Sequence, residues 1–131
     1  MDAREFIQIG MNAERILTVT PDLTVRRFVP TIPAVYATPM MIMAMEMTSA
    51  DAIATALLQS WVTVGTEVDI RRLAATPVGR QVRTISRVTA VERKAIRFEV
   101  EAFDGERRIG EGRHGRGLVN VASFMRRLGE R

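Results

Sequence analysis

The sequence lacks cysteine altogether and contains one histidine, one lysine and few aromatic residues. The absence of cysteine excludes disulfide bonds, thiolate metal sites and a cysteine nucleophile. The basic residues give a net charge of +4, but they are scattered and carry no aromatic platforms between them, which argues against nucleic-acid binding. The segment from Met1 to Phe6 contains acidic residues and no apolar run of the secretory type. We therefore expect a cytoplasmic protein.

A methionine-rich stretch from Thr38 to Gln59 is the one long helical candidate. Thr38 suits the N-cap position and Pro39 the first helical position. Apolar residues fall on almost every side, which predicts a helix buried by surrounding protein. Glu46 and Asp51 within the stretch argue against a membrane span. With 131 residues, 47% of them hydrophobic, the chain is expected to form one domain over residues 1–131.

The remaining segments are rich in strand formers. Before the helix we expect a strand and a short extended piece, and after it four strands and a closing helix, at 14–20, 24–29, 66–75, 81–91, 95–103, 106–121 and 122–128. Asp104-Gly105 is a hairpin signal. A strand, a long buried helix and a run of antiparallel strands predict an α+β hot-dog fold, in which the sheet wraps the helix. Because such a sheet leaves an edge, we expect a homodimer, or a tetramer.

The alternation after Gly65 predicts where one arginine points. Arg72 shares its face with Thr66, Val68, Ile70 and Ala74, on the core side. A buried guanidinium needs a partner, and we expect that partner to be Glu46, a carboxylate among apolar residues of the helix. Two interpretations of Glu46 remain open at this point, a structural ion pair and a functional carboxylate.

Alternate residues of the last predicted strand lie on one of its faces and form a second set of candidates: Gly110, Gly112, His114 and Arg116. The glycines allow either close packing on the helix or ligand access. His114 is either a structural histidine with its hydrogen bonds satisfied or a ligand contact. Arg116 either binds an anionic group such as a phosphate or decorates the sheet edge.

Five motifs in order resemble a known family. They are Ile32-Pro33-Ala34-Val35-Tyr36-Ala37-Thr38, Glu46, Gly65-Thr66, Leu73-Ala74-Ala75-Thr76-Pro77-Val78-Gly79, and Gly110-x-Gly112-x-His114-x-Arg116. Together they look like the fluoroacetyl-CoA thioesterase-like branch of the hot-dog superfamily, and the likeness covers most of the chain. No single motif decides it.

The resemblance implies a homodimeric acyl-CoA thioesterase whose sites lie at the subunit interface and need no metal or cofactor. It implies a threonine, a glutamate and a histidine as the catalytic set, and Thr38 and Glu46 match the first two. Gly65 matches a glycine near the thioester carbonyl, and Arg116 an arginine near the site. The family also has a histidine at the position of His114. Where the family has its catalytic histidine, this chain has Arg72.

Arginine stays protonated, so Arg72 cannot act as a general base, although it can stabilise an oxyanion. We expect hydrolysis of a small acyl-CoA thioester with Thr38, Glu46 and Arg72 as catalytic residues. Gly65, His114 and Arg116 are expected to bind substrate. The alternative is a hot-dog protein that binds an acyl thioester without turnover, and a hydratase would need an Asp/Asn–His pair that the helix lacks. In a helix, Thr38 and Glu46 would be about 12 Å apart, so a substrate, a bend or a second subunit must bridge them.

Overall fold

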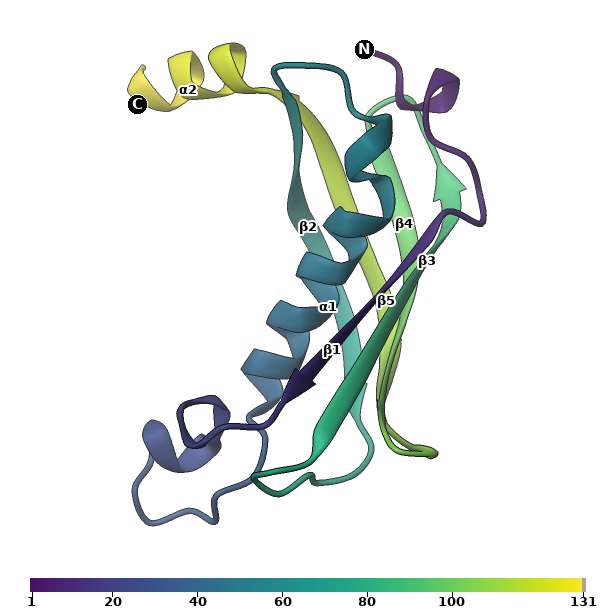
Figure 1. Cartoon of the computed structure of the whole chain (residues 1–131). Coiled ribbons are helices and arrows are strands. Elements are labelled where there is room, and N and C mark those ends of the chain that lie inside the picture. Colours follow the sequence, from purple (N-terminus) through teal and green to yellow (C-terminus); the bar gives the residue numbers. More distant parts are fainter. Residues whose placement is uncertain (131) are drawn as a thin grey trace.

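The computed structural model describes residues 1–130 and contains one five-stranded antiparallel sheet that curves around one long helix (Figure 1). The elements are β1 (Asn12–Thr18), α1 (Thr38–Ile53), β2 (Trp61–Arg72), β3 (Gln81–Val91), β4 (Ala95–Asp104), β5 (Arg107–Asn120) and α2 (Val121–Gly129). Short 3-10 helices lie at Ala3–Glu5, Pro21–Leu23, Val25–Arg27 and Ala54–Ala56. The strand order is β1-β3-β4-β5-β2, so β3, β4 and β5 form a meander and β1 and β2 are the two edges.

The helix α1 is buried on the side that faces the sheet. Its core side chains Met41, Met45 and Ile53 are almost fully buried, whereas Met43 on the outer side is 51% exposed. The sheet therefore covers α1 on one side only. The distribution of apolar residues had predicted a helix surrounded by protein, and within one chain that prediction was wrong. Among residues 1–130, no helix is both long enough and apolar enough to cross a membrane.

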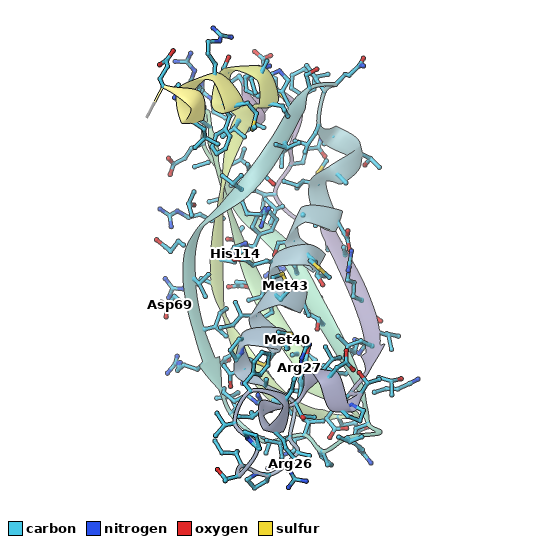
Figure 2. All side chains as sticks on the ribbon, turned by 90° about the vertical axis from the view of Figure 1, so that its left-hand side faces the viewer. Arg26, Arg27, Met40, Met43, Asp69 and His114 are labelled. Carbon is cyan, nitrogen blue, oxygen red and sulfur yellow. The ribbon has the colours of Figure 1, made fainter. Side chains whose placement is uncertain are left out.

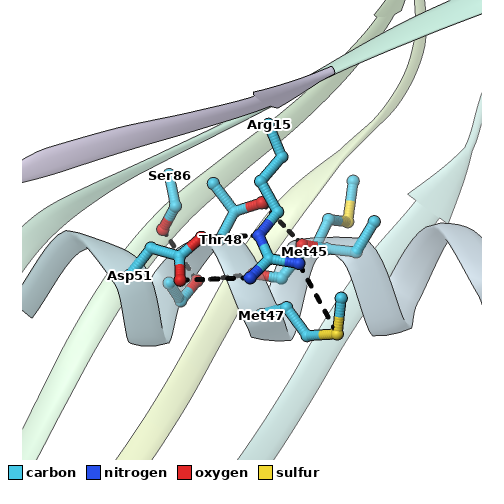
Figure 3. Close-up of polar contacts among 8 residues, drawn as sticks. Arg15, Met45, Met47, Thr48, Asp51 and Ser86 are labelled. Atoms are coloured by element: carbon cyan, nitrogen blue, oxygen red, sulfur yellow. Dashed lines mark hydrogen bonds and ion pairs between the residues drawn. The ribbon is translucent and has the colours of Figure 1, made fainter. Parts of the chain in front are cut away.

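Polar contacts fix α1 to the β1–β3 half of the sheet (Figure 3). Arg15 of β1 forms an ion pair with Asp51, with Nη2 to Oδ1 at 3.2 Å. Deeper in the interface, the hydroxyl groups of Ser49 and Ser86 are hydrogen-bonded at 2.7 Å. Both serines are fully buried, and a buried hydroxyl without a partner would be costly. These contacts fix the side of α1 that faces β1 and β3.

Most predicted elements are present, and the boundaries of β3 agree to the residue. The boundaries of β1, β4, β5 and α2 differ by at most two residues, and three predicted elements differ by more. The piece at 24–29 is a 3-10 helix at Val25–Arg27, because Thr24 pairs only as an isolated bridge with Tyr36. The helix α1 ends at Ile53 and a 3-10 turn follows. The strand predicted at 66–75 begins at Trp61 and ends at Arg72.

A β-bulge interrupts β2 between Gly65 and Glu67. The extra residue, Thr66, and Glu67 both lie over Gly115, on the side of the sheet away from His114. The predicted phase was therefore wrong for Thr66, which does not face the core, since a bulge shifts the alternation by one residue. Beyond the bulge the phase holds, and Arg72 reaches the helix as expected.

Candidate active site

Two polar clusters lie where β2 borders α1. The first, which we call the Arg72 cluster, consists of Tyr36, Thr38, Arg72 and Ala74. Arg72 donates from Nε to the carbonyl oxygen of Ala74 at 2.7 Å and from Nη1 to the carbonyl oxygen of Tyr36 at 2.7 Å and Oγ1 of Thr38 at 3.2 Å. Its guanidinium also lies 5.7 Å from the centre of the Tyr36 ring. Arg72 thus ties the loop before α1 and the end of β2 to the first residue of the helix.

Thr38 does not cap the helix, contrary to the prediction. Ala37 occupies the N-cap position and provides no side-chain hydrogen bond, and Thr38 is already helical. The hydroxyl oxygen of Thr38 accepts the hydrogen bond from Arg72 instead. This contact brings Thr38 and Arg72, two of the three predicted catalytic residues, together.

The predicted ion pair between Arg72 and Glu46 is not formed. In the described part of the chain no carboxylate lies within 4.0 Å of Arg72. The physical reason is axial distance, because Arg72 is held at Thr38 and eight residues of helix span about 12 Å. Burial lowers the pKa of Arg72, with Tyr36 opposing this shift, and burial raises the pKa of Tyr36 to about 12.

Arg72 keeps an unused donor. Its Nη2 atom is buried and has no hydrogen-bond partner among residues 1–130. A buried guanidinium nitrogen that lacks an acceptor is unfavourable by itself. The Arg72 cluster therefore provides a positive group that an oxygen atom from outside this chain would satisfy.

The second cluster, which we call the Glu46 cluster, consists of Glu46, Thr63, Gly65, His114 and Arg116. Gly65 lies directly against the carboxylate of Glu46: a Cβ atom at this position would be 2.9 Å from Oε1 and 3.4 Å from Cε1 of His114. Figure 2 looks onto this side of the molecule, with His114 at mid-height near α1 and Asp69 of β2 pointing away from the helix. The absence of a side chain at Gly65 is what admits the carboxylate.

His114 and Arg116 are bound to each other and to β2. The Nδ1 atom of His114 is 2.8 Å from the carbonyl oxygen of Glu67, and Nη1 of Arg116 is 3.1 Å from Nε2 of His114. A carbonyl can only accept and a guanidinium can only donate. His114 is therefore neutral, with its proton on Nδ1. Burial lowers its pKa, the hydrogen bond to Glu67 opposes this, and the charge of Arg116 lowers it further.

Arg116 is a buried residue, only 8% exposed. It donates from Nε to Oγ1 of Thr63 at 2.8 Å and from Nη2 to the carbonyl oxygen of Thr63 at 2.8 Å. Burial lowers its pKa, and the nearby charge of Glu46 opposes that shift. Arg116 therefore does not decorate the sheet edge, and three of its nitrogen atoms are already used within the protein.

The glycines of β5 serve close packing. A Cβ atom at Gly110 would be 2.5 Å from the sulfur atom of Met41, and one at Gly112 would be 2.1 Å from the carbonyl oxygen of Asp69. Gly110 therefore lets α1 approach the sheet, and Gly112 lets β2 approach β5. Of the two interpretations of these glycines, close packing is the one that the contacts support.

The chain was compared with known proteins and structures. The family described as fluoroacetyl-CoA-specific thioesterase matches residues 19–122. The chain belongs to this family. The fluoroacetyl-CoA thioesterase of Streptantibioticus cattleyicolor is 29% identical over 127 residues, which cover 92% of this chain and 91% of that protein. Membership of the fluoroacetyl-CoA-specific thioesterase family supports acyl-CoA thioesterase activity and confirms the resemblance seen in the sequence.

Solved structures agree with this family and with the predicted fold. A variant of the fluoroacetyl-CoA thioesterase in complex with acetyl-CoA superposes with a TM-score of 0.89 at 28% identity, covering 95% of this chain and 98% of that chain. A hot-dog-like protein from Thermanaerovibrio acidaminovorans has a TM-score of 0.91 at 21% identity, covering 99% and 96% of the two chains. The hot-dog fold predicted from the sequence is confirmed.

Sequence reasoning missed Thr63 in this member of the thioesterase family. Because the strand was predicted to begin at residue 66, Thr63 lay outside it. The alternation Trp61, Thr63, Gly65 on one face of a longer strand was the available signal. The carbonyl group of Glu67, the other anchor of the Glu46 cluster, leaves no signal in a sequence.

Proposed function

We propose that this protein hydrolyses the thioester bond of a small acyl-CoA at a site that two copies of the chain complete. The observation that carries the proposal is the contact of Gly65 with the Glu46 carboxylate, in a member of a thioesterase family. A carboxylate beside a backbone without a side chain leaves room for a thioester carbonyl next to a base or nucleophile.

Within one chain the candidate residues fall into two half-sites. Thr38 and Arg72 belong to one, and Glu46 and Gly65 to the other. Since Thr38 and Glu46 are about 12 Å apart along the helix, neither half-site contains both an anionic group and an unused cationic donor. The missing half must therefore come from outside this chain.

The edge strand β2 supports a second copy as the source. It is twelve residues long and pairs with β5 alone among the strands of this chain, and an unpaired edge favours pairing with another strand. In an antiparallel pair of β2 strands, Gly65 in the first half of one strand would lie toward the partner's Arg72 at the end of the other. Each site would then combine Glu46 and Gly65 of one copy with the partner's Arg72 and the partner's Thr38.

The chemistry follows from these groups. Glu46 takes a proton from a water molecule whose oxygen attacks the thioester carbon, or it attacks that carbon itself to give an anhydride that water then hydrolyses. The backbone N–H of Gly65 and the guanidinium of Arg72 stabilise the negative charge that develops on the carbonyl oxygen. The C–S bond breaks, the CoA thiolate takes up a proton, and the acid is released. Thr38 positions water or substrate, and Arg72 takes no part in proton transfer because it stays protonated.

A second candidate function is acyl-CoA binding without turnover. The observation that favours it is Arg72 itself, which stands where the family has an imidazole and cannot shuttle a proton. In that case Glu46 and Gly65 would hold a thioester that nothing activates.

One assay separates the two candidates. The purified protein is offered short, branched and aryl acyl-CoAs, and free thiol is followed, with Glu46→Ala and Arg72→His measured beside the wild type. For a thioesterase we expect Glu46→Ala to lower kcat by about a thousandfold or more on the preferred substrate. Wild-type turnover no higher than that of Glu46→Ala on every substrate would refute catalysis. A gain of activity in Arg72→His would indicate lost chemistry, and a monomer in light scattering would contradict the shared site.

A further inference from the structure

The bulge in β2 lies next to Gly65 and therefore affects how the Gly65 backbone is placed against the Glu46 carboxylate. The strand leaves its register with β5 between Gly65 and Glu67, so Gly65 is the last residue on the inner face before the irregularity. Within the part of the chain that the structure describes, β2 pairs with β5 only, and the bulge locally disrupts the ladder of hydrogen bonds between these two strands. The position of Gly65 therefore needs support from contacts other than the ladder.

Side chains of β5 provide that support on both sides of the bulge. Before it, Arg116 holds Thr63 at two points, the hydroxyl and the carbonyl oxygen, both at 2.8 Å. After it, Nδ1–H of His114 donates to the carbonyl oxygen of Glu67 at 2.8 Å. The two β5 residues are joined by the hydrogen bond of Arg116 to Nε2 of His114 at 3.1 Å. The result is a closed bracket, Thr63–Arg116–His114–Glu67, with Gly65 inside it.

The two β5 side chains of the bracket are buried, and their hydrogen bonds are made within the protein. His114 is 1% exposed and Arg116 is 8% exposed, and the His114 ring also stacks on Phe98 with 6.1 Å between the ring centres. Burying a guanidinium and an imidazole is unfavourable unless their hydrogen bonds are satisfied. Both side chains are thus committed to β2, and the arrangement is rigid where the proposed chemistry needs precision.

We propose that Thr63 is a positioning residue for thioester hydrolysis, acting through Arg116 and His114 to hold the Gly65 backbone against the Glu46 carboxylate. This inference rests on the proposed function. Thr63 does not touch Glu46 in any contact described above, and its effect passes through the bulge. Both hydrogen bonds of the threonine matter, but only the one to Oγ1 can be removed by substitution, because the other uses the backbone.

The test compares Thr63→Val, which keeps the shape and removes the hydroxyl, with Thr63→Ser, which keeps the hydroxyl. Thr18→Val is the matched control, since Thr18 is an exposed threonine of the other edge strand, β1. We expect Thr63→Val to lower kcat by about tenfold or more with KM changed less than about twofold, since misplaced reacting groups lower the rate steeply. Thr63→Ser should recover the wild-type kcat to within about threefold, and Thr18→Val should match the wild type.

Amide hydrogen exchange over residues 63–68 is the second measurement and does not depend on activity. Thr63→Val should speed exchange in this segment at least about fivefold, whereas Thr63→Ser and Thr18→Val should not. Unchanged exchange in Thr63→Val would overturn the bracket, and faster exchange with an unchanged kcat would overturn the positioning role. If the wild type hydrolyses no acyl-CoA, the proposed function fails and the positioning role fails with it, while the exchange data still decide whether the bracket holds the bulge.

Discussion

The Arg72 cluster and the Glu46 cluster are each built around an arginine, half-buried Arg72 and buried Arg116, and the two arginines do different things. Arg116 binds Thr63 and His114 with three nitrogen atoms and belongs to the frame of the sheet. Arg72 binds two backbone carbonyl groups and Thr38 and keeps a buried Nη2 atom without a partner among the residues that the structure describes. Arg116 therefore supports the structure of the site, whereas Arg72 has a hydrogen-bond donor left for substrate.

The difference also bears on the role of Arg72, which stands where the resemblance to the family implies a catalytic histidine. An arginine that served only to fill space would be expected to have all its hydrogen-bond donors paired with acceptors of the protein, as Arg116 very nearly does. Arg72 instead holds the loop before α1 through Tyr36 and Ala74 and remains a permanent positive charge at the start of the helix. A fixed cation can stabilise an oxyanion, although it cannot exchange a proton.

Replacing each arginine by methionine should separate the two roles most clearly. Arg116→Met leaves the Thr63 carbonyl and Nε2 of His114 without a donor, which should lower the free energy of unfolding by about 3 kcal/mol. Arg72→Met should cost about 1 kcal/mol, because the groups that it releases lie at a loop and a helix end. On the preferred acyl-CoA, however, Arg72→Met should lower kcat by about a hundredfold. This loss of activity is larger than the small loss of stability would suggest.

Chemical denaturation of both variants provides the measurement. Arg87→Met is the control, since the Arg87–Glu99 ion pair lies on the surface with both side chains more than half exposed and should contribute less than about 1 kcal/mol. Equal losses of stability in Arg72→Met and Arg116→Met would mean that both arginines are structural, and the contrast between the clusters would be lost.

The sequence predicted which face of an element a side chain lies on better than it predicted how far along the element it lies. The alternation correctly predicted that Arg72 points toward α1. Alternation states only which face of a strand a side chain occupies, not its position along the helix that it faces. The expected partner Glu46 lies about two helical turns from Thr38, where Arg72 is bound. The boundaries of β3 followed from its alternation and its flanking turns. The boundaries of β2 did not, because the strand was predicted from residue 66, whereas β2 begins at Trp61 and has a bulge just after Gly65. A bulge is a property of two paired strands, and one strand's sequence does not encode it alone.

Two glycines, Gly65 beside Glu46 and Gly110 beside Met41, allow the same comparison between a residue of the site and a residue of the core. A methyl group at Gly65 would be 2.9 Å from Oε1 of Glu46, at the end of a side chain that can swing away. Gly65→Ala should therefore cost less than about 1 kcal/mol of stability but lower kcat about tenfold, because the carboxylate must move from its place.

Gly110 provides the opposite case on the neighbouring strand. A methyl group there would be 2.5 Å from the sulfur atom of Met41, which is fully buried, so Gly110→Ala should lower the free energy of unfolding by about 1–3 kcal/mol through overpacking. Thermal unfolding and thiol release on both variants provide the measurements. If Gly65→Ala were the less stable of the two with unchanged kcat, Gly65 would be a packing glycine and its contact with Glu46 incidental.

The smallest effect concerns pH and depends on the imidazole of His114, which belongs to the Glu46 cluster. His114 is neutral in the folded protein, with its pKa lowered from 6.5, first by burial. In the unfolded chain the ring titrates near 6.5, so below that pH the unfolded state binds more protons than the folded state. The stability that neutral His114 contributes is therefore complete above pH 6.5 and is lost as the pH falls through the folded-state pKa.

His114→Asn is the informative variant for this effect, because an asparagine amide can still donate to the Glu67 carbonyl but does not titrate. The charged groups that face His114 are Glu46, from α1, and Arg116, from its own strand, and both are present in the variant as in the wild type. Unfolding free energies measured from pH 8 to pH 5 should show a constant gap between wild type and His114→Asn above pH 6.5. Below it the wild type should lose stability faster, since protonation at Nε2 would set a cation against Arg116 and release the bracket. Parallel curves over the whole range would mean that His114 accepts a proton without disturbing Arg116, and the neutral tautomer assigned from the hydrogen bonds would be wrong.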